Sequence, residues 1–474
     1  MSDNLEFLFH PRSIALVGIS ATNPDHWTHS LLDGLLKMEF PDPIYPVNFK
    51  GGEMHGLKVY QSLRDIPGDV DYVIGLVPAA SATELVKNCA GKGVRAIHFC
   101  TAGFSETGEE EGTKMEAELT ATARKSGIRI IGPNCMGLYC PKAHLSFSPY
   151  FLSESGSIAL ISQSGGIGTS VIRQATPRGL RFSKAISYGN ACDLNECDYL
   201  EYLADDSDTR IIAMYVEGTK DGKKFRRALE KAARKKILVL LKGGVTESGT
   251  RAAAGHTGAM AGSETAWDAL CKQHGIIRVH SIVEMLDVLV ALEFMPSPGG
   301  KNAACIGAGG GASVLISDAF EKHELKVPRL PESLISRIRE FTPIAGNIFK
   351  NPIDYGQNMS EFDKFSKTIE IVSQWDGVDF VVKFIIPSMG VRPMTMDPAQ
   401  AKMLARLFIT SGQSSKPVIM VIEPNASPQD MESVAVIQEE CISARMPLYH
   451  SFEAAANAIN VVAGYNERYP GKLS

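Results

Sequence analysis

The sequence lacks the patterns of a secreted, membrane-spanning or nucleic-acid-binding protein. Its nine cysteines include no C-x-x-C pair, which favours reduced thiols over a cysteine metal site. No apolar run approaches the roughly 18 residues that span a bilayer, and no secretory signal is recognisable at the start. The 48 basic and 53 acidic residues give a net charge of −5, which argues against general binding to nucleic acid or anionic membranes. We therefore expect a cytoplasmic protein.

Two nucleotide-binding fingerprints are also missing. A dinucleotide motif, G-x-G-x-x-G, would need three glycines after the first predicted strand, and Gly18-Ile-Ser-Ala-Thr-Asn-Pro24 has one. Lys50 follows the second predicted strand, near the place where the ribose-binding acid of that motif would fall. A lysine there favours a phosphorylated ribose or a different ligand altogether. No G-x-x-x-x-G-K-[ST] motif is present, so the chain has no P-loop.

What the sequence does contain is a repeated alternation of strand and helix patterns. A length of 474 residues predicts about three domains, and the alternation predicts the α/β class with parallel, doubly wound sheets. The predicted strands of the first unit are residues 13–18, 44–47, 72–77, 94–99 and 128–131, and its helices are 31–39, 81–90 and 109–126. A second unit covers about 150–292, and a Pro/Gly linker at 293–300 leads into a third.

The loops after the strands of the first unit are rich in glycine and small polar residues. Ligands of doubly wound sheets bind beyond the carboxyl ends of the strands. These loops begin near Gly18, Pro46, Val77, Thr101 and Gly132. They suit a nucleotide-like ligand, and plain turns remain the alternative.

In the second unit a predicted strand at 157–161 runs into Ser162-Gln-Ser-Gly-Gly166 and then a helical pattern. Such a turn binds phosphate, because backbone N–H groups and the positive end of the helix dipole face the anion. An ordinary βα turn is the alternative. Glu217 follows the predicted strand 210–216, at the edge where this turn and His256 should meet. It could hold one nitrogen of an imidazole while the other attacks, or be an exposed loop glutamate.

A stretch of small residues from 242 to 262 contains a single histidine, His256. Glycines on both sides, Gly255 and Gly258, favour a flexible loop that could carry the imidazole to another molecule and back. In the third unit, residues 307–311 are either an anion loop or a tight turn, and residues 351–356 are predicted to form an ordered loop. Histidine spacings indicate no metal site.

Short motifs follow one another in a specific order along residues 12–292. They are Gly18-Ile-Ser20, Phe49-Lys-Gly-Gly52, Val77-Pro-Ala79, Thr101-Ala-Gly103, Ile131-Gly-Pro-Asn-Cys135, Ser162-Gln-Ser-Gly165, Glu217-Gly218 and Gly255-His-Thr-Gly-Ala259. This ordered set resembles the α subunit of the NDP-forming acyl-CoA synthetases, the group that contains succinyl-CoA synthetase and ADP-forming acetyl-CoA synthetase. The third unit, with Gly309-Gly-Gly311 and Asn351-Pro-Ile-Asp354, resembles the extra domain of the acetyl-CoA-type branch.

The resemblance implies a Rossmann-like CoA-binding domain at 1–145, a flavodoxin-like domain with the phosphohistidine loop at 146–292, and a second flavodoxin-like ligase domain at 301–474. It implies that His256 is the phosphorylated nucleophile and that Glu217 orients it. The implied CoA contacts are Gly18, Ser20, Lys50, Val77, Pro78, Ala79, Thr101, Gly103 and Asn134. The implied phosphate contacts are Ser162, Gln163, Ser164, Gly165, Gly166 and Gly255.

The family reaction converts acyl-CoA, phosphate and NDP into a free carboxylic acid, CoA and NTP, through an acyl phosphate and then phosphohistidine. The family's nucleotide site is an ATP-grasp domain of roughly 200 residues or more, larger than any spare segment here. The resemblance therefore implies a separate ATP-grasp β subunit that holds Mg²⁺ and ADP or ATP, in an α2β2 assembly. Two alternatives are a CoA-dependent acyl or carbamoyl transferase that needs no nucleotide and a non-catalytic CoA-binding protein.

Overall fold

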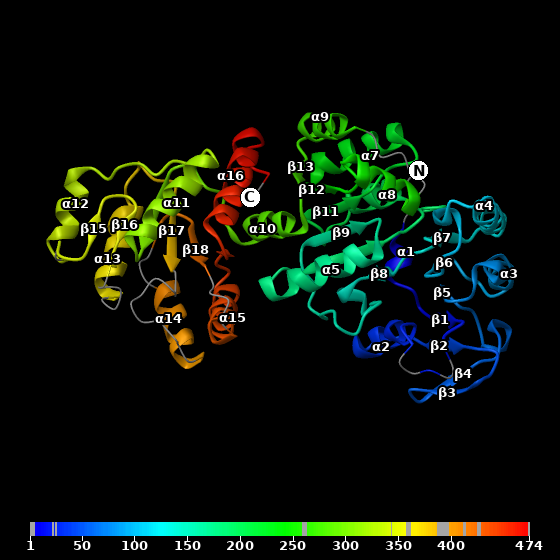
Figure 1. Ribbon diagram of the computed structural model, residues 1–474. Helices are drawn as coiled ribbons and strands as arrows, with labels where there is room; N and C mark the ends of the chain where they lie inside the picture. The colour runs from blue at the N-terminus through cyan, green and yellow to red at the C-terminus, as the bar shows by residue number, and fades with distance from the viewer. Residues whose placement is uncertain are drawn as a thin grey trace. The chain divides into compact units, whose positions relative to one another are not determined.

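The computed structural model contains two compact units. It describes residues 5–20, 23, 26–257, 263–342, 344–356, 362–385, 398–410, 414–423 and 428–472. The first unit comprises Met1–Thr176 and Arg181–Ile282, and the second comprises Pro177–Leu180 and Val283–Ser474. Three sheets lie in the first unit, two large ones and a two-stranded one of β3 (Gly52–Met54) and β4 (Leu57–Val59), and one lies in the second; Figure 1 shows the elements of each.

A five-stranded parallel sheet forms the N-terminal part of the first unit. Its order is β2-β1-β5-β6-β7, and its strands are β1 (Ile14–Val17), β2 (Ile44–Val47), β5 (Tyr72–Gly75), β6 (Ala96–Phe99) and β7 (Arg129–Ile131). Helices α3 (Ala79–Ala90) and α4 (Glu110–Lys125) pack together on one face, and α2 (His29–Lys37) lies on the other (Figure 1). The chain changes direction across the sheet between β1 and β5, which is where such folds bind ligands.

A six-stranded sheet in the order β13-β12-β11-β9-β10-β8 completes the first unit. Its strands are β8 (Gly137–Tyr139), β9 (Ile158–Ser162), β10 (Phe182–Ser187), β11 (Ile211–Val216), β12 (Ile237–Lys242) and β13 (Ile277–Val279). Only β8 is antiparallel to its neighbour. Helix α5 (Gly165–Ala175) lies on one side of the sheet and α7 (Gly222–Lys235) on the other (Figure 1). The chain changes direction across this sheet between β9 and β11, so the ligand-binding switch point of the second sheet lies there.

The second unit is built on a third sheet in the order β15-β16-β14-β17-β18-β19. Its strands are β14 (Ala303–Gly307), β15 (Ile348–Phe349), β16 (Ile353–Asp354), β17 (Phe380–Ile385), β18 (Val418–Ile422) and β19 (Leu448–Tyr449). Its helices are α10 (Ile282–Phe294), α11 (Gly310–Lys322), α12 (Glu332–Arg339), α13 (Phe362–Ser373), α14 (Pro398–Thr410), α15 (Pro428–Ser443) and α16 (Phe452–Arg468). The remaining named elements of the first unit are α1 (Glu6–Phe9), β3 (Gly52–Met54), β4 (Leu57–Val59), α6 (Glu196–Leu203), α8 (Glu247–Thr257) and α9 (Glu264–His274).

The predicted α/β class is confirmed, with a CoA-binding Rossmann-like unit and flavodoxin-like units, because the three large sheets are parallel apart from β8 and β15. The three predicted domain ranges remain a prediction. Residues 137–139 of the first range form β8, which pairs with β10 of the second sheet. None of the described helices is long and apolar enough to cross a membrane.

The prediction of a flexible loop over residues 242–262 is wrong for 247–257, which form helix α8. Three consecutive alanines from Ala252 supply high helix propensity. The Thr246 hydroxyl accepts a hydrogen bond from the backbone N–H of Gly249 at 3.0 Å, and Glu247 pairs with Arg251 one turn later at 2.6 Å. These local bonds offset the conformational freedom of the glycines. Residues 258–262 lie outside the described part of the chain.

In the second unit, the predicted ordered loop at 351–356 instead contains β16, which pairs in parallel with β14. The Asp354 carboxylate accepts hydrogen bonds from the backbone N–H groups of Gly309 at 2.7 Å and Gly356 at 2.8 Å. This side chain supplies a negative charge where the loop at 307–311 enters α11. The arrangement favours a structural turn over an anion site there.

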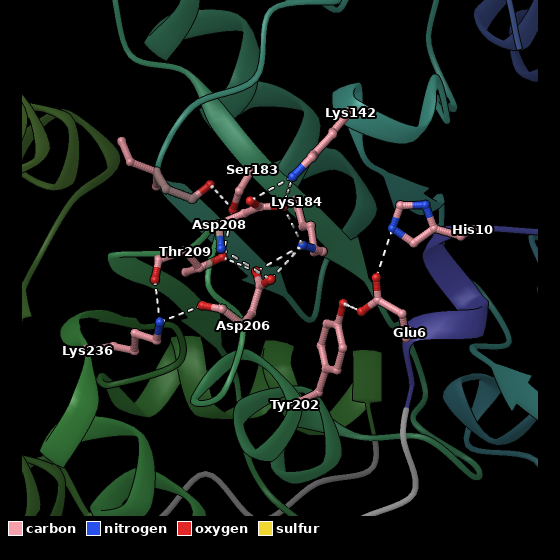
Figure 2. Close-up of polar contacts among 11 residues, drawn as sticks. Glu6, His10, Lys142, Ser183, Lys184, Tyr202, Asp206, Asp208, Thr209 and Lys236 are labelled. Carbon is pink, nitrogen blue, oxygen red and sulfur yellow. Dashed lines mark hydrogen bonds and ion pairs between the residues drawn. The ribbon is translucent and has the colours of Figure 1, made fainter.

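A buried ion pair joins β10 of the second sheet to the loop after α6, beside the N-terminal helix (Figure 2). Lys184 of β10 and Asp206 lie 2.9 Å apart, with side chains only 3% and 8% exposed. The Lys184 ammonium also lies near the rings of Phe9 and Tyr202, and the Tyr202 hydroxyl donates to Glu6 at 2.7 Å. The pair therefore connects α1 to the sheet through charge as well as packing.

Candidate functional site

The larger cavity of the first unit lies at the switch point of its first sheet. It has a volume of about 690 Å³. Its lining residues are Val17, Gly18, Val47, Asn48, Phe49, Gln61, Ser62, Leu63, Arg64, Leu76, Val77, Pro78, Glu84, Leu85 and Asn88. They come from the ends of β1, β2 and β5, from the turn at 61–64 that follows β4, and from the middle and last turns of α3. A cavity of this size suits a ligand of nucleotide-like dimensions.

Donors and cations border this cavity. Pro78 is the N-cap of α3, so the free N–H groups and positive dipole end of a twelve-residue helix are available there. Arg64 lines the wall, and its guanidinium donates to Asn88 at 3.0 Å. Lys50 is exposed directly after Phe49, itself 77% exposed. The cavity thus pairs an apolar floor with positive charge, as a phosphorylated nucleotide requires.

Gly18 fits this place because a side chain there would collide with the neighbouring strand. Its φ is +94°, and a Cβ would lie 2.9 Å from the backbone of Leu76. The close approach lets the loops after β1 and β5 form one continuous wall. This is the physical reason for glycine at the end of the first strand.

A smaller cavity of about 200 Å³ lies where the two sheets of the first unit meet. Its lining residues are Cys100, Asn134, Cys135, Met136, Gln163, Ser164, Gly165, Gly166, Gly189 and Asn190. Cys100 and Asn134 follow β6 and β7, whereas Gln163 to Gly166 follow β9. One cavity therefore combines the carboxyl edge of the first sheet with the first turn of α5.

The N-terminus of α5 forms one wall of the smaller cavity, and its free backbone N–H groups are chemically suited to an anion. Ser164 is its N-cap and accepts a hydrogen bond from the backbone N–H of Ile167 at 3.3 Å. The N–H groups of Gly165 and Gly166 belong to the first turn, where helical partners are missing. The Ser162 hydroxyl instead donates to the Ser164 carbonyl at 2.6 Å and so supports the turn from behind.

Glu217 joins the same switch point from β11. Its backbone N–H donates to the Gln163 side chain at 2.7 Å, and Tyr215 donates to its carboxylate at 3.1 Å. The residue is 6% exposed, so the alternative of an exposed loop glutamate is wrong. Lys242 donates to the Glu217 carbonyl at 2.7 Å, and burial lowers the pKa of that lysine. These contacts fix the position of Glu217 beside the turn from Ser162 to Gly166.

Asn190, another lining residue of the smaller cavity, is hydrogen-bonded to two carboxylates. Asn190 follows β10 and donates through Nδ2 to Glu106 at 2.5 Å and to Glu116 at 2.9 Å. Burial favours a higher pKa for Glu106, but the hydrogen bonds from Asn190 and from the backbone at Gly103 and Phe104 outweigh it and lower the pKa. The carboxylate is therefore ionised at neutral pH. Sequence motifs gave no signal for this network, because its partners are far apart along the chain.

A neutral histidine lies behind the smaller cavity. His98 of β6 is buried, and burial lowers its pKa to about 4. Its Nε2 lies 3.2 Å from Cys100 Sγ and 3.3 Å from the Cys135 carbonyl. At neutral pH it adds no positive charge to the cavity. Among the described residues, no group of three or more His, Cys, Asp or Glu side chains is arranged to hold a metal ion.

The structure divides the predicted site residues between the two cavities. Gly18, Val77 and Pro78 line the larger one. Asn134, Gln163, Ser164, Gly165 and Gly166 line the smaller one. Ser20, Lys50, Ala79, Thr101, Gly103 and Ser162 line neither, although each lies beside a lining residue or on the loop that carries one. The sequence analysis missed Gln61, Ser62, Arg64 and Asn88, which lie outside its motifs.

His256 and Gly255 lie on the last turns of α8. The helix begins shortly after β12, which pairs directly with β11, the strand that ends before Glu217. The position of the His256 side chain lies outside what the structure describes. The backbone topology alone therefore brings the helix of His256 and the strand of Glu217 to the same edge of the second sheet.

Two family models match the first unit. A CoA binding domain matches residues 12–141, and a succinyl-CoA ligase like flavodoxin domain matches residues 155–292. The α subunit of acetate–CoA ligase [ADP-forming] II from Pyrococcus furiosus is 38% identical over 82% of this chain and 84% of that protein. Acetate–CoA ligase [ADP-forming] I from Archaeoglobus fulgidus is 35% identical over 81% of this chain but only 55% of that protein.

A solved structure extends the likeness to the second unit. It is the dinucleotide forming acetyl-coenzyme A synthetase 1 of Ca. Korarchaeum cryptofilum in complex with phosphate and ADP. The match has a TM-score of 0.81 and 30% sequence identity, and it covers 98% of this chain and 97% of that chain.

Proposed function

The chain belongs to the NDP-forming acyl-CoA synthetase family, with the α subunits of ADP-forming acetate–CoA ligases, and on that premise we propose that its His256 carries phosphate from an acyl phosphate to ADP on a partner subunit. The family resemblance and the ligase class predicted from the sequence are confirmed. The observation that supports the proposal best is the smaller cavity, which combines CoA-domain loops with a helix N-terminus suited to phosphate.

CoA would lie along the carboxyl edge of the first sheet. The larger cavity would take its nucleotide end, with the pyrophosphate near the N-terminus of α3 and the 3′-phosphate near Lys50 and Arg64. The pantetheine arm would continue past β5 towards β6 and β7, where Cys100 and Asn134 line the smaller cavity. This path delivers the thiol to the N-terminus of α5.

The reaction would take place at the N-terminus of α5 in two successive steps. A phosphate oxygen attacks the thioester carbonyl, the C–S bond breaks, and the CoA thiolate leaves and takes up a proton. The neutral His256 imidazole then attacks phosphorus, the P–O bond to the acyl group breaks, and the carboxylate leaves. Fixed dipoles of the first turn of α5 would stabilise the phosphoryl charge throughout. Glu217 would hold the other imidazole nitrogen.

The volume of the smaller cavity limits the size of the carboxylic acid that it could bind. At about 200 Å³ it lies below the roughly 300–1,000 Å³ that holds drug-sized ligands. Met136 contributes to the narrowness, because it packs so closely against Gly165 that a Cβ at that glycine would lie 2.7 Å from its side chain. We therefore assign a short-chain carboxylic acid to this site, in line with the acetate named for the relatives.

A partner would hold the nucleotide. The relative called an α subunit is covered over 84% of its length, whereas the Archaeoglobus relative, not called a subunit, is covered over only 55%. We propose that a separate ATP-grasp β subunit, in an α2β2 complex, binds Mg²⁺ and ADP or ATP in the cytoplasm. Because His256 lies on a helix, transfer would move α8 as a whole, about Gly243 and Gly244, which precede it in sequence.

The complete complex tests the proposal. The chain is purified with its partner and given Mg-ATP labelled on the γ-phosphate, and the label on this chain is followed in acid and in base. We expect an acid-labile, base-stable label that disappears on addition of CoA and acetate together. A nucleotide-independent acyl transferase would exchange CoA with acyl phosphate but acquire no label from ATP, and a non-catalytic protein would do neither.

Lys50→Ala tests the place of the CoA 3′-phosphate. The variant should bind CoA about 3- to 10-fold more weakly, since an exposed ammonium–phosphate contact contributes about 1 kcal/mol. Its affinity for dephospho-CoA should match that of the wild type. Isothermal titration calorimetry measures both. Lys87→Ala, an exposed lysine later on α3, is the matched control, and equal losses for the two ligands would place the 3′-phosphate elsewhere.

Glu217→Gln tests the orienting carboxylate. The isosteric amide keeps the backbone bond to Gln163 but loses the charge that stabilises an imidazolium. We expect phosphorylation of His256 to slow by about 10- to 100-fold, in the range seen for supporting ligands of catalytic groups, with little change in thermal stability. Rapid-quench labelling gives the rate. An unchanged rate would remove Glu217 from the mechanism.

A further inference from the structure

Lys242, the last residue of β12, is a buried charged residue to which the proposed mechanism gives no role. Its side chain belongs to a residue that is only 5% exposed. Placing an ammonium group inside a protein costs free energy unless hydrogen bonds replace those that it makes with water. An apolar side chain would fit the end of a buried strand without that cost. The contacts of Lys242 therefore show what the charge is used for.

The Lys242 ammonium binds the backbone at two places that are far apart in the sequence. It donates to the Glu217 carbonyl at 2.7 Å and to the carbonyl of Gly243, its own neighbour. Its nitrogen also lies 5.4 Å from the centre of the Trp267 ring on α9, within the range of a cation–π contact. Two of its three N–H groups are thus committed to backbone carbonyls. These contacts suit a residue that holds the backbone, not one that touches substrate.

Gly243 is hydrogen-bonded through both of its backbone groups. Its N–H donates to the Val216 carbonyl at 3.0 Å, which adds one more bond to the pairing of β11 with β12. Its carbonyl accepts from Lys242. Because Gly243 lies between β12 and α8, these bonds fix the start of the connection about which the helix of His256 would turn.

Tyr215 connects Gly243 to the Glu217 carboxylate. Its hydroxyl donates to that carboxylate at 3.1 Å, and its ring passes close to Gly243. A Cβ at residue 243 would lie 2.5 Å from the Tyr215 oxygen, so a shift of this backbone towards the ring would displace the hydroxyl. Lys242 therefore holds Glu217 in two ways, directly at its carbonyl and, through Gly243 and Tyr215, at its carboxylate.

We propose that Lys242 is a positioning residue for phosphate transfer, which holds the Glu217 carboxylate and the start of the connection to α8 where the carboxylate can meet His256. The inference rests on the proposed phosphohistidine mechanism. Lys242 would contribute only through the contact between Glu217 and the imidazole, without touching the phosphate. The proposed CoA contacts lie on the loops of the first sheet, so loss of Lys242 should change the rate of phosphate transfer and not the binding of CoA.

Lys242→Met tests the assignment on the complete complex, because methionine has an unbranched side chain with no charge and no donor. Phosphorylation of this chain by Mg-ATP, followed by rapid quench, should slow by about 10- to 100-fold. In the steady state kcat should fall while the KM for CoA keeps its wild-type value. Lys383→Met is the matched control, since Lys383 of β17 is also buried and donates to the Phe408 carbonyl at 2.5 Å in the second unit. An equal loss in both variants, or none in Lys242→Met, would overturn the assignment.

A double-variant cycle separates positioning from general support of the fold. Because Lys242 would act only through the Glu217 carboxylate, adding Lys242→Met to Glu217→Gln should slow labelling no further than Glu217→Gln alone. Losses that multiply in the double variant would show that the lysine acts elsewhere and would reject the proposal. A wild type that takes no label rejects the phosphohistidine mechanism, whereas a labelled wild type with an equally fast Lys242→Met rejects the role of Lys242 alone.

Gly243→Ala carries the test if Lys242→Met fails to fold. Gly243 has no positive φ, so its backbone accepts alanine, and the added Cβ would push the Tyr215 hydroxyl away from Glu217. Labelling should again slow by about 10- to 100-fold, with no added loss in combination with Glu217→Gln. A Gly243→Ala chain labelled at the wild-type rate would break the connection from Gly243 to the carboxylate, and the proposal with it.

Discussion

His256→Asn is expected to reduce net synthesis of acyl-CoA or ATP by at least about 10³-fold, because the proposed route passes through a covalent bond to this imidazole. Asparagine preserves polarity and approximate size but cannot take up a phosphoryl group. Labelling from Mg-ATP should disappear from this chain. CoA affinity should stay at the wild-type value, because the proposed CoA contacts lie on the loops of the first sheet, whereas His256 lies on α8 of the second. Coupled assays and calorimetry measure the two properties separately.

A matched control uses a histidine of the other unit. His323 ends α11, and His323→Asn should leave both labelling and turnover unchanged. Substantial synthesis by His256→Asn would show that phosphate reaches ADP directly from the acyl phosphate. That outcome would retain the ligase class, which rests on the family, and reject the covalent intermediate.

Asp206→Asn should lower the free energy of unfolding by about 3–5 kcal/mol, the usual cost of leaving one member of a buried ion pair without its partner. Lys184 would lose the carboxylate 2.9 Å away and keep only that of Asp208, which lies 4.0 Å away and is 34% exposed (Figure 2). Because Lys184 also connects to α1, hydrogen exchange should accelerate in both α1 and β10. Urea unfolding at neutral pH measures the stability change.

Lys142→Met is the matched control, because it removes an exposed ion pair whose two charged groups are as close together as those of Lys184 and Asp206. Lys142 and Asp208 also lie 2.9 Å apart, but the lysine side chain is 62% exposed. Water and salt screen such a pair, so its loss should cost less than about 1 kcal/mol. A similar cost for the two substitutions would mean that burial does not control the strength of the Lys184–Asp206 pair.

Local patterns were sufficient for most of the secondary structure. The run at 44–47 was predicted as a strand, and β2 has those bounds. The run at 210–216 likewise matches β11 to within one residue. The turn from Ser162 to Gly166 was predicted to enter a helix, and Ser164 caps α5 through a bond to a residue only three positions away. Interactions of such short range can be read from the sequence because their partners are adjacent in it.

Local sequence patterns gave wrong or ambiguous predictions in two places, the helix of His256 and the position of Glu217. Glycine at 249, 255 and 258 argued for a loop, but the alanines between them and a first-turn glutamate formed α8 up to residue 257. Glu217 was ambiguous in the sequence, because a glutamate after a strand is as often exposed as buried. Its burial depends on Gln163, 54 residues earlier in the chain, and on Lys242, 25 residues later.

The sequence by itself determined the α/β class, the succession of strands and helices along the chain, the family and the motifs that surround the two cavities. Only the tertiary structure decided that Asn134 and Gly165 share one cavity, that Arg64 borders the other, and that Asn190 faces two carboxylates 74 and 84 residues away. The physical reason is that a helix cap or an apolar strand is stabilised by its neighbours in sequence. A binding wall is instead made of groups that meet only after separate sheets have packed together.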